Sequence, residues 1–373
     1  MLRFLTAGES HGPALIGIVE GLPAGLRIEP ELIDRDLARR QMGVGRSARM
    51  RIEHDRVEIV SGVMKGQTIG APVALKIENL DYANWKDKVV PPQTIPRPGH
   101  ADLAGALKYG WDDLRLVAER ASARETAMRV ACGSLARRLL AEFSIVVGSH
   151  VLEIGGIHAD IPDAPYEEIF ARAMDSDVCV ADQTSSEKIA ARIQEVMRAK
   201  DTVGGVIEIV ALNVPVGLGS HVHWDRKLDG RLAQAVMSIQ SVKGVEIGTA
   251  FENAQHLGTE VQDEIVSVGT VREPPLRKSN RAGGLEGGIT NGMPIVIRAA
   301  LKPIATTATP LHTVDMATGE ATLAPYQRSD FCHVPRAGVI GEAMVAWVLA
   351  DALMEKLGGD SVHEMKAHSE NTR

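Results

Sequence analysis

A serine and a histidine lie side by side between two glycines near the start of the chain, in Gly8-Glu9-Ser10-His11-Gly12. Glycine adopts backbone angles closed to other residues and leaves room for a ligand. The serine hydroxyl both donates and accepts hydrogen bonds, and a histidine can move a proton near neutral pH. The segment therefore predicts a turn at which a small ligand approaches the backbone closely.

The same residues also fit the Gly-x-Ser-x-Gly pattern of serine hydrolases, so Ser10 must be weighed as a nucleophile. In those enzymes the serine joins a central strand to a helix, after several strands have been built. Here only a short apolar segment, residues 2–5, precedes the motif, and residues 13–20 after it are typical of a second strand. This context favours a hairpin turn over a nucleophile elbow.

Arginines are concentrated in one short stretch of the chain. Guanidinium groups match the geometry of carboxylate and phosphate oxygens, so such a group suits a small anionic ligand. Charge pattern alone equally allows a solvated basic face. The net charge of -7 argues against general nucleic-acid binding. The arginines are Arg39, Arg40, Arg46, Arg49 and Arg51.

Two further segments present polar groups. The proline-rich residues 79–99 predict a long irregular loop, which delivers Arg97-Pro98-Gly99-His100. Residues 119–143 predict a long helix whose first turns carry Arg120, Ser122 and Arg124. The start of a helix offers free N–H groups, so this one could bind phosphate.

The remaining pattern predicts a mixture of helices and strands without a linker or an internal repeat. A polar, frayed tail is expected after Gly358. A glycine-rich loop occupies residues 283–288. Strands are expected at 57–60, 73–77, 145–157, 206–212 and 295–301, and helices at 30–42, 119–143, 189–197, 228–236 and 337–356.

Composition narrows the class of protein. The chain has 373 residues, of which 45% are hydrophobic, as expected for a globular fold, and no apolar run suggests a membrane span. No secretory leader is visible, and three scattered cysteines (Cys132, Cys179 and Cys332) fit free thiols in a reducing cytoplasm. His221 and His223 lack a third ligand, so no metal site is predicted.

Three segments, taken together and in order, resemble the signatures of the chorismate synthase family. They run from Gly8 to Pro23, from Glu119 to Leu135 and from Arg328 to Met344. Arg97-Pro98-Gly99-His100, residues 243–248 and residues 302–304 are also similar to that family, so the resemblance spans nearly the whole chain. One position departs from it: Phe331 lies where the family usually has Pro, Ser or Val.

The resemblance implies an enzyme of the shikimate pathway for aromatic amino acids. It would convert 5-enolpyruvylshikimate 3-phosphate to chorismate by an anti 1,4-elimination of phosphate, as a carbon–oxygen lyase. The reaction would need reduced FMN without net redox change, with NADPH or a separate flavin reductase as the source of electrons. The implied fold is α+β, a βαβ sandwich with helices packed between antiparallel sheets, in a single domain over residues 1–373 that forms a cytoplasmic homotetramer. No reductase segment is visible, which favours a monofunctional enzyme.

The resemblance also implies roles for individual residues. His11 and His100 are the candidate acids, toward flavin and phosphate respectively, and Asp330 is expected near flavin N5. Expected substrate contacts are Ser10, Arg40, Arg46, Arg49 and Arg124; Arg40 and Arg46 also match positions that contact a nicotinamide nucleotide. Expected flavin contacts are Arg120, Ala121, Ser122, Gln240, Ser241, Gly287, Lys302, Pro303, Ile304, Ala305, Thr306 and Arg328. A serine hydrolase and a flavin- or anion-binding module without turnover are the alternatives.

Overall fold

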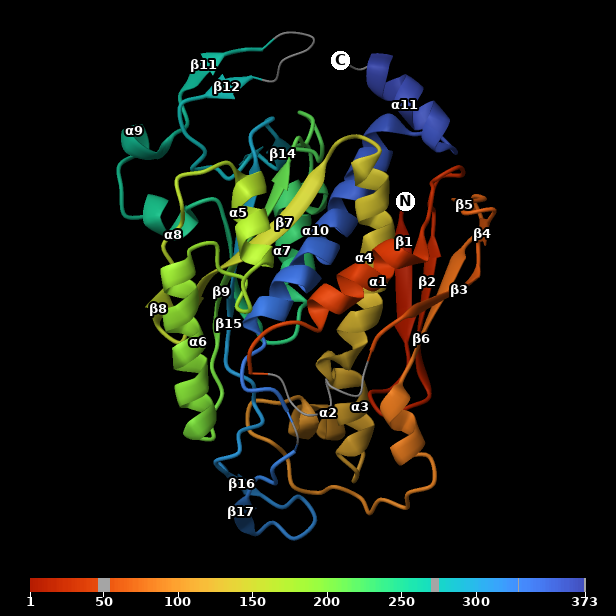
Figure 1. Ribbon diagram of the computed structural model, residues 1–373, viewed down its shortest axis with the longest axis vertical. Helices are drawn as coiled ribbons and strands as arrows, with labels where there is room; N and C mark the ends of the chain where they lie inside the picture. The colour runs from red at the N-terminus through yellow and green to blue at the C-terminus, as the bar shows by residue number, and fades with distance from the viewer. Residues whose placement is uncertain (46–53, 270–274, 328, 372–373) are drawn as a thin grey trace.

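Two antiparallel sheets enclose a layer of helices in the computed structural model, which describes residues 1–45, 54–269, 275–327 and 329–371 (Figure 1). One sheet has the strand order β1-β2-β6-β3 and the other the order β10-β15-β9-β7-β8. This arrangement confirms the predicted α+β sandwich with helices between antiparallel sheets.

The first sheet is built from the N-terminal hairpin and two later strands. β1 (Arg3–Ala7) pairs with β2 (Ala14–Glu20), and β6 (Val73–Glu78) lies between β2 and β3 (Val57–Ser61). Side chains alternate between the faces of a strand, so Leu15 and Val19 of β2 are fully buried while Ile18 is exposed. The inner face of this sheet is therefore apolar and packs on helices.

The second sheet contains the longer C-terminal strands. β9 (Gly205–Leu212) lies at its centre, between β15 (Ile295–Leu301) and β7 (Val146–Ile154). β10 (Val242–Ile247) and the short β8 (Ile157–His158) form the edges.

Four helices fill the space between the sheets. α4 (Thr126–Ala141) packs on the first sheet, α10 (Val334–Leu357) packs on β7 and β9 of the second, and the two helices contact each other along their length. α1 (Pro30–Arg40) and α7 (Leu228–Met237) complete the layer. One hydrophobic core contains side chains from both sheets and all four helices. The single domain stays a prediction.

Shorter elements surround this sandwich. They are β4 (Val63–Met64), β5 (Gln67–Thr68), a 3₁₀ turn (Leu80–Asn84), α2 (Asp102–Tyr109), α3 (Arg115–Ala121), a 3₁₀ turn (Ala123–Glu125), α5 (Tyr166–Met174), α6 (Gln183–Arg198), a 3₁₀ turn (Trp224–Arg226), α8 (Ala250–Asn253), α9 (Gly258–Val261), β11 (Ile265–Ser267), β12 (Leu276–Arg277), β13 (Leu285–Glu286), β14 (Ile289–Thr290), β16 (His312–Val314), β17 (Ala321–Leu323) and α11 (Val362–Asn371).

The continuous helix predicted over residues 119–143 is wrong in its first turns. α3 ends at Ala121, Ser122 is extended, and α4 begins only at Thr126. The Ser122 hydroxyl accepts a hydrogen bond from the backbone N–H of Arg124 at 3.2 Å, which stabilises the break. The break turns Arg124 toward the first sheet instead of leaving it on a helix surface.

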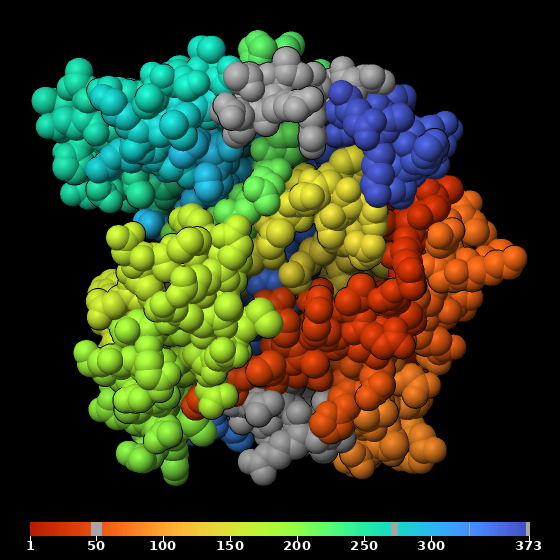
Figure 2. All heavy atoms as spheres, turned by 45° about the horizontal axis from the view of Figure 1, so that its top comes forward, coloured from red at the N-terminus to blue at the C-terminus, as the bar shows by residue number. Residues whose placement is uncertain are grey.

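The frayed tail predicted after Gly358 is also wrong. Residues 362–371 form α11, and the side chains of Val362 and Met365 are buried. Ser361 forms a parallel β-bridge with Ala24, so the helix lies against the N-terminal region (Figure 2). Two buried apolar side chains in one helical turn suffice to dock an otherwise polar segment.

α10 is long and apolar enough to span a membrane by composition, with a mean hydropathy of 1.6. However, 89% of its apolar window is buried inside the structure, which identifies it as a core helix. No other helix in the described ranges passes the same test.

The contact between α4 and α10 is closest at Gly133. A Cβ at this position would lie 2.5 Å from Cβ and 2.7 Å from Cα of Ala343, closer than van der Waals contact allows. We expect Gly133→Ala to lower the free energy of unfolding by about 1–3 kcal/mol, measured by urea denaturation, because the helices must separate.

The matched control is Gly230→Ala on α7, where an added Cβ meets nothing within 4 Å. It should stabilise the protein slightly, by up to about 1 kcal/mol, because alanine favours the helix. Equal effects of the two substitutions would show that the helix contact does not depend on Gly133.

Candidate active site

The loop with Ser10 and His11 joins β1 to β2, which confirms the predicted hairpin. Glu119 of α3 holds this loop: its carboxylate accepts from the backbone N–H of His11 at 2.7 Å and lies 2.8 Å from Nδ1 of the same ring. Ser10 is buried, and its backbone N–H donates to the Glu119 carbonyl. The ring of Trp85 also packs against the ring of His11, 4.4 Å away between centroids. His11 is therefore fixed in orientation.

Asn79 links the hairpin loop to Arg124. Its side-chain amide donates to the carbonyl oxygens of Glu9 and Gly12, at 3.1 and 2.8 Å. Its own Oδ1 accepts from Nε of Arg124 at 2.8 Å. One buried amide thus sets the position of the loop relative to the guanidinium group.

Asp55 binds two arginines in the interior. Nη1 of Arg124 lies 2.6 and 2.8 Å from its carboxylate oxygens, and Nη1 of Arg40 lies 3.5 Å from one of them. Arg40 also donates to the Thr126 hydroxyl and the Ala123 carbonyl, both at 3.0 Å. The two arginines and Asp55 are each less than 10% exposed. The alternative of a solvated basic face is therefore excluded for Arg40, and Arg124 is equally buried.

Arg336, in the first turn of α10, adds a third positive charge beside Arg40. It pairs with Asp330 through Nη1, whereas its Nε and Nη2 are buried and have no partner among the described residues. Buried donors without a partner are costly, so they mark a place where an oxygen ligand is needed. We call Arg40, Arg124 and Arg336 the arginine cluster.

The electrostatics of the arginine cluster favour an anion. Burial lowers the pKa of Arg40 to about 10 despite the opposing effect of Asp55, and the charges of Arg124 and Arg336 act in the same direction as burial. Arg40 still carries its charge at neutral pH. Three guanidinium groups face two described carboxylates, Asp55 and Asp330, so a bound anion would relieve the excess positive charge.

Next to Arg336, burial and that arginine's charge lower the pKa of His333 to about 4. The His333 ring is therefore uncharged at neutral pH and adds no positive charge to the site.

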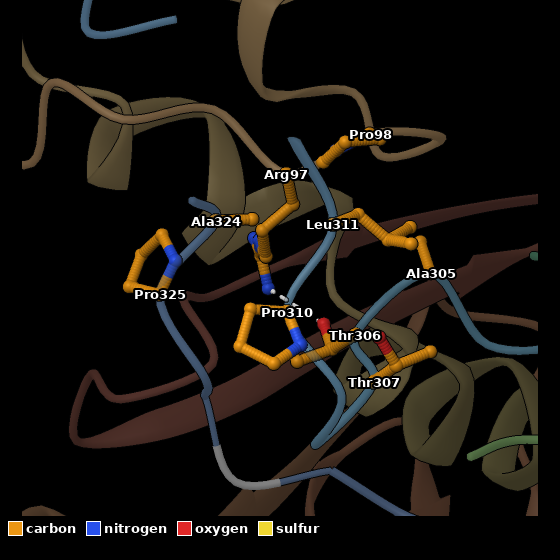
Figure 3. A pocket seen from close by; sticks show the side chains of 9 residues that line it. All are labelled: Arg97, Pro98, Ala305, Thr306, Thr307, Pro310, Leu311, Ala324 and Pro325. Atoms are coloured by element: carbon orange, nitrogen blue, oxygen red, sulfur yellow. Dashed lines mark hydrogen bonds between the residues drawn. The ribbon is translucent and has the colours of Figure 1, made fainter. Parts of the chain in front are cut away.

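His100 belongs to a second group of contacts. This group is connected to the arginine cluster by Ser329, which precedes Asp330, the partner of Arg336. Arg97 and Asp102 both contact its Nδ1, at 3.1 and 2.5 Å. The guanidinium of Arg97 also points to the Thr306 hydroxyl, 3.4 Å away (Figure 3). The Thr306 carbonyl in turn accepts from the Ser329 hydroxyl, next to Asp330.

Most expected flavin residues form two neighbouring groups. Arg120 and Gln240 line an open pocket of about 480 Å³ beside Thr6 and Glu125, and Ala121 and Ser122 continue the chain from Arg120. Residues 302–306 lie beside the His100 loop, where Lys302 Nζ donates to the Gly99 carbonyl at 2.5 Å. Ser241 joins the groups, because its carbonyl accepts from the backbone N–H of Lys302.

Within the second group, Ala305 lines a small pocket with Arg97 and Pro98, and the Ile304 carbonyl accepts from Thr202 (Figure 3). Pro303 lies between these residues in the chain. Ser241 has a φ of 72°, a left-handed conformation that residues other than glycine seldom adopt. Such conformations are concentrated at functional sites.

Gly287 is not brought to this site. It lies in the turn between β13 and β14, before β15 begins, whereas Lys302 follows the other end of that strand. Seven residues of β15 separate the two ends by about 20 Å. Arg46, Arg49 and Arg328 lie outside the described residues, so their predicted roles stay predictions.

The structure assigns Arg39 to the core instead of the site. Its guanidinium makes two hydrogen bonds, at 2.8 and 2.7 Å, to the fully buried carboxylate of Glu342 on α10. The prediction that placed Arg39 with Arg40 in one group of anion-binding arginines is therefore wrong for Arg39.

Sequence reasoning missed several residues that hold the site. Asp55 and Asn79 carry no motif, and only the fold brings them to Arg124. A signal existed for Arg336, one of only two charged residues between positions 334 and 350, and for Asp102, two residues after His100. Arg97 lies in the motif that contains His100.

The cysteines and the exposed histidine pair show no reactive environment. Burial raises the pKa of Cys132 to about 12 and the pKa values of Cys179 and Cys332 to about 11. His223 is exposed and pairs with Asp225 at 2.7 Å. Within the described ranges, no group of three or more potential ligands could hold a metal ion.

If Asp55 neutralises the buried arginines, Asp55→Asn should lower the free energy of unfolding by about 3–5 kcal/mol, because two charges lose their partner. Inorganic phosphate should raise the melting temperature of the variant more than that of the wild type, since a bound anion replaces the lost charge. Urea unfolding and thermal melts with added phosphate measure these effects.

Asp225→Asn, at an exposed carboxylate, is the control and should change neither property. A variant at Asp55 with wild-type stability would contradict the proposed dependence of the arginines on this carboxylate.

Comparison with known proteins identifies the family. The family model described as chorismate synthase matches residues 2–354. Chorismate synthase of Desulforudis audaxviator is 55% identical, over 98% of this chain and 95% of that protein. The Aquifex aeolicus chorismate synthase is 51% identical, over 99% and 97%. A crystal structure of chorismate synthase superimposes with a TM-score of 0.81 and 44% identity, covering 100% of this chain and 97% of that one.

These findings confirm the predicted carbon–oxygen lyase and exclude the serine hydrolase, for which the hairpin setting of Ser10 also offers no support. Enzymes of the chorismate synthase family require a reduced flavin. The chain belongs to the chorismate synthase family.

Proposed function

We propose that the arginine cluster and the two histidines form the place at which this lyase eliminates phosphate from 5-enolpyruvylshikimate 3-phosphate to give chorismate. The observation that carries this proposal is the pair of buried Arg336 nitrogens that have no partner among the described residues, next to two further buried guanidinium groups. The cluster has more guanidinium groups than described carboxylates, so it suits a ligand with several anionic groups.

The substrate has such groups, because it carries two carboxylates and one phosphate. Arg40, Arg124 and Arg336 supply positive charge that is already fixed by Asp55, Asp330 and Asn79. Little side-chain entropy remains to be lost when the anion binds, which favours affinity. Ser10, Arg46 and Arg49 remain further candidates for the substrate.

His11 and His100 are the candidate proton donors of the site. Phosphate that departs without a proton or a cation would carry concentrated charge, so a general acid beside it assists the elimination. We assign His100 to the departing phosphate and His11 to the flavin. Asp330, bound to Arg336, is the candidate group near flavin N5.

The residues present fit a flavin mononucleotide. Gln240 Oε1 is buried and has no partner in the described part of the chain, so it can accept a hydrogen bond from a ring edge. Arg120, Lys302 and the Thr306 hydroxyl offer groups for phosphate and ring atoms, with Ala121, Ser122, Ser241, Pro303, Ile304, Ala305 and Arg328 as further contacts. When bound and reduced, FMN would supply electron density while phosphate leaves.

We propose that the protein assembles as a homotetramer, and the position of Gly287 supports this. The β13–β14 turn lies before the start of β15 and Lys302 follows its end, and the strand between them is about 20 Å long, which favours contact of Gly287 with the flavin of another copy. We therefore propose that Gly287 serves a neighbouring subunit in the assembly.

The source of electrons is a separate matter. The chorismate synthase family model accounts for residues 2–354 of the chain. We propose a monofunctional cytoplasmic enzyme whose FMN is reduced by a separate reductase, with NADPH as the ultimate donor.

The direct test is phosphate release from 5-enolpyruvylshikimate 3-phosphate without oxygen, with FMN oxidised or chemically reduced. We expect release, together with chorismate absorbance, only with reduced FMN. His100→Ala should lower turnover by ~10²–10⁴-fold while FMN still binds, because the acid is lost.

His158→Ala, on the exposed end of β8, is the control for histidine removal and should keep wild-type turnover. No release with reduced FMN demonstrably bound would overturn the proposal and favour a binding module. Full turnover by His100→Ala would overturn the acid assignment alone.

A further inference from the structure

His100 is held by a carboxylate two residues away. Asp102, the first residue of α2, has its Oδ1 2.5 Å from Nδ1 of His100, and its side chain is only 3% exposed. Arg97 binds the same carboxylate through Nε at 2.7 Å and Nη2 at 2.9 Å, and its backbone N–H donates to Oδ2. Asp102 therefore cannot rotate without breaking four contacts.

The geometry decides which nitrogen of His100 carries a proton. Arginine nitrogens only donate, so Nη2 of Arg97, 3.1 Å away, would favour an unprotonated Nδ1. The carboxylate oxygen of Asp102 only accepts hydrogen bonds, and it lies closer to Nδ1, at 2.5 Å. If Nδ1 carried no proton, its lone pair would face a lone pair of this oxygen at that distance, which is repulsive. The shorter contact dominates, so Nδ1 donates to Asp102 and Nε2 is the nitrogen left for a ligand.

Asp102 remains ionised in this arrangement. Burial alone would raise the pKa of its carboxyl group, but hydrogen bonds from His100 and Arg97 outweigh burial and hold that pKa well below its ordinary value. Because Arg97 also reaches Thr306, the pair is tied to residues 302–306 beside it. The ring of His100 is thus oriented relative to the expected flavin segment.

The same relation occurs at the other candidate acid. Glu119 accepts from Nδ1 and from the backbone N–H of His11, at 2.8 and 2.7 Å. Two histidines in separate loops are thus each held at Nδ1 by a carboxylate from a neighbouring element. The repetition favours a functional arrangement over a chance ion pair.

We propose that Asp102 is the positioning residue of the proton transfer from His100: it fixes the tautomer and aims Nε2 at the departing phosphate. This inference rests on the acid role proposed for His100 above. Before the elimination the His100 ring carries a proton on both nitrogens, and its positive charge is paired with the Asp102 carboxylate. When the C–O bond breaks, the proton on Nε2 passes to the phosphate oxygen. The ring becomes neutral and its Nδ1–H still donates to Asp102.

A double-mutant cycle tests this inference in the full-length enzyme with reduced FMN and substrate. Asp102→Asn should lower kcat by about 10²-fold with little change in KM, because the ring loses its orientation while substrate contacts remain. In the His100→Ala background, Asp102→Asn should cause no further loss, because it acts only through that ring. Glu260→Gln, in α9 and exposed in the His256–Glu260 pair, should leave kcat and KM unchanged.

Circular dichroism and FMN binding establish that each variant is folded. If Asp102→Asn does not fold, Asp102→Glu replaces it, since it keeps the charge for Arg97 but displaces the carboxylate from Nδ1. The same loss in kcat and the same non-additivity are expected.

Wild-type kcat in a folded Asp102 variant, or losses that add to those of His100→Ala, would overturn the inference while leaving the acid role of His100 intact. Full turnover by His100→Ala alone would instead show that the acid role fails.

Discussion

Two guanidinium groups, those of Arg40 and Arg124, converge on the buried carboxylate of Asp55, and much of the site is arranged around that contact. Arg40 comes from α1, Arg124 from the break between α3 and α4, and Asp55 from the segment before β3. The contact of these arginines with Asp55 joins the helical layer to the first sheet. Asn79 links Arg124 to the Ser10–His11 loop, which connects two strands of that sheet. Buried charges are costly when unpaired, so the fold must bring these three segments together.

The sandwich itself serves as a rigid support for short polar loops. Sheets and helices bury an apolar core, and the candidate groups lie on the loops and element ends around it. His11 follows β1, His100 precedes α2, Lys302 follows β15 and Arg336 opens α10. One set of contacts runs from Glu119 through the hairpin loop and Asn79 to Arg124. A second set runs from Arg336 through Asp330 and Ser329 to Thr306 and Arg97, and the two sets are coupled by the charges of Arg40 and Arg336. Each catalytic candidate is thus oriented by a neighbour that does not itself react.

Much of this could be predicted from sequence, and the failures have physical reasons. Alternating or helical apolar patterns located the strands of the two large sheets, except β10, and the four helices between them, because burial is periodic. The break at Ser122 was missed because one side-chain hydrogen bond interrupts an otherwise helical pattern, and α11 because two buried side chains dock a polar segment. Motifs located His11, His100 and Arg124, yet Asp55 and Asn79 are ordinary polar residues until the fold brings them together. Arg39 and Arg40 are adjacent in sequence but point into different environments, the core and the site.

The central claim is that the arginine cluster is a prearranged site for the substrate's anionic groups. A crystal structure of the protein with 5-enolpyruvylshikimate 3-phosphate and oxidised FMN tests it most directly. The account predicts oxygen atoms of the substrate within hydrogen-bond distance of Arg336 Nε or Nη2, with Arg40 and Arg124 still bound to Asp55. Substrate bound elsewhere, with all three guanidinium groups contacting only protein, would contradict it.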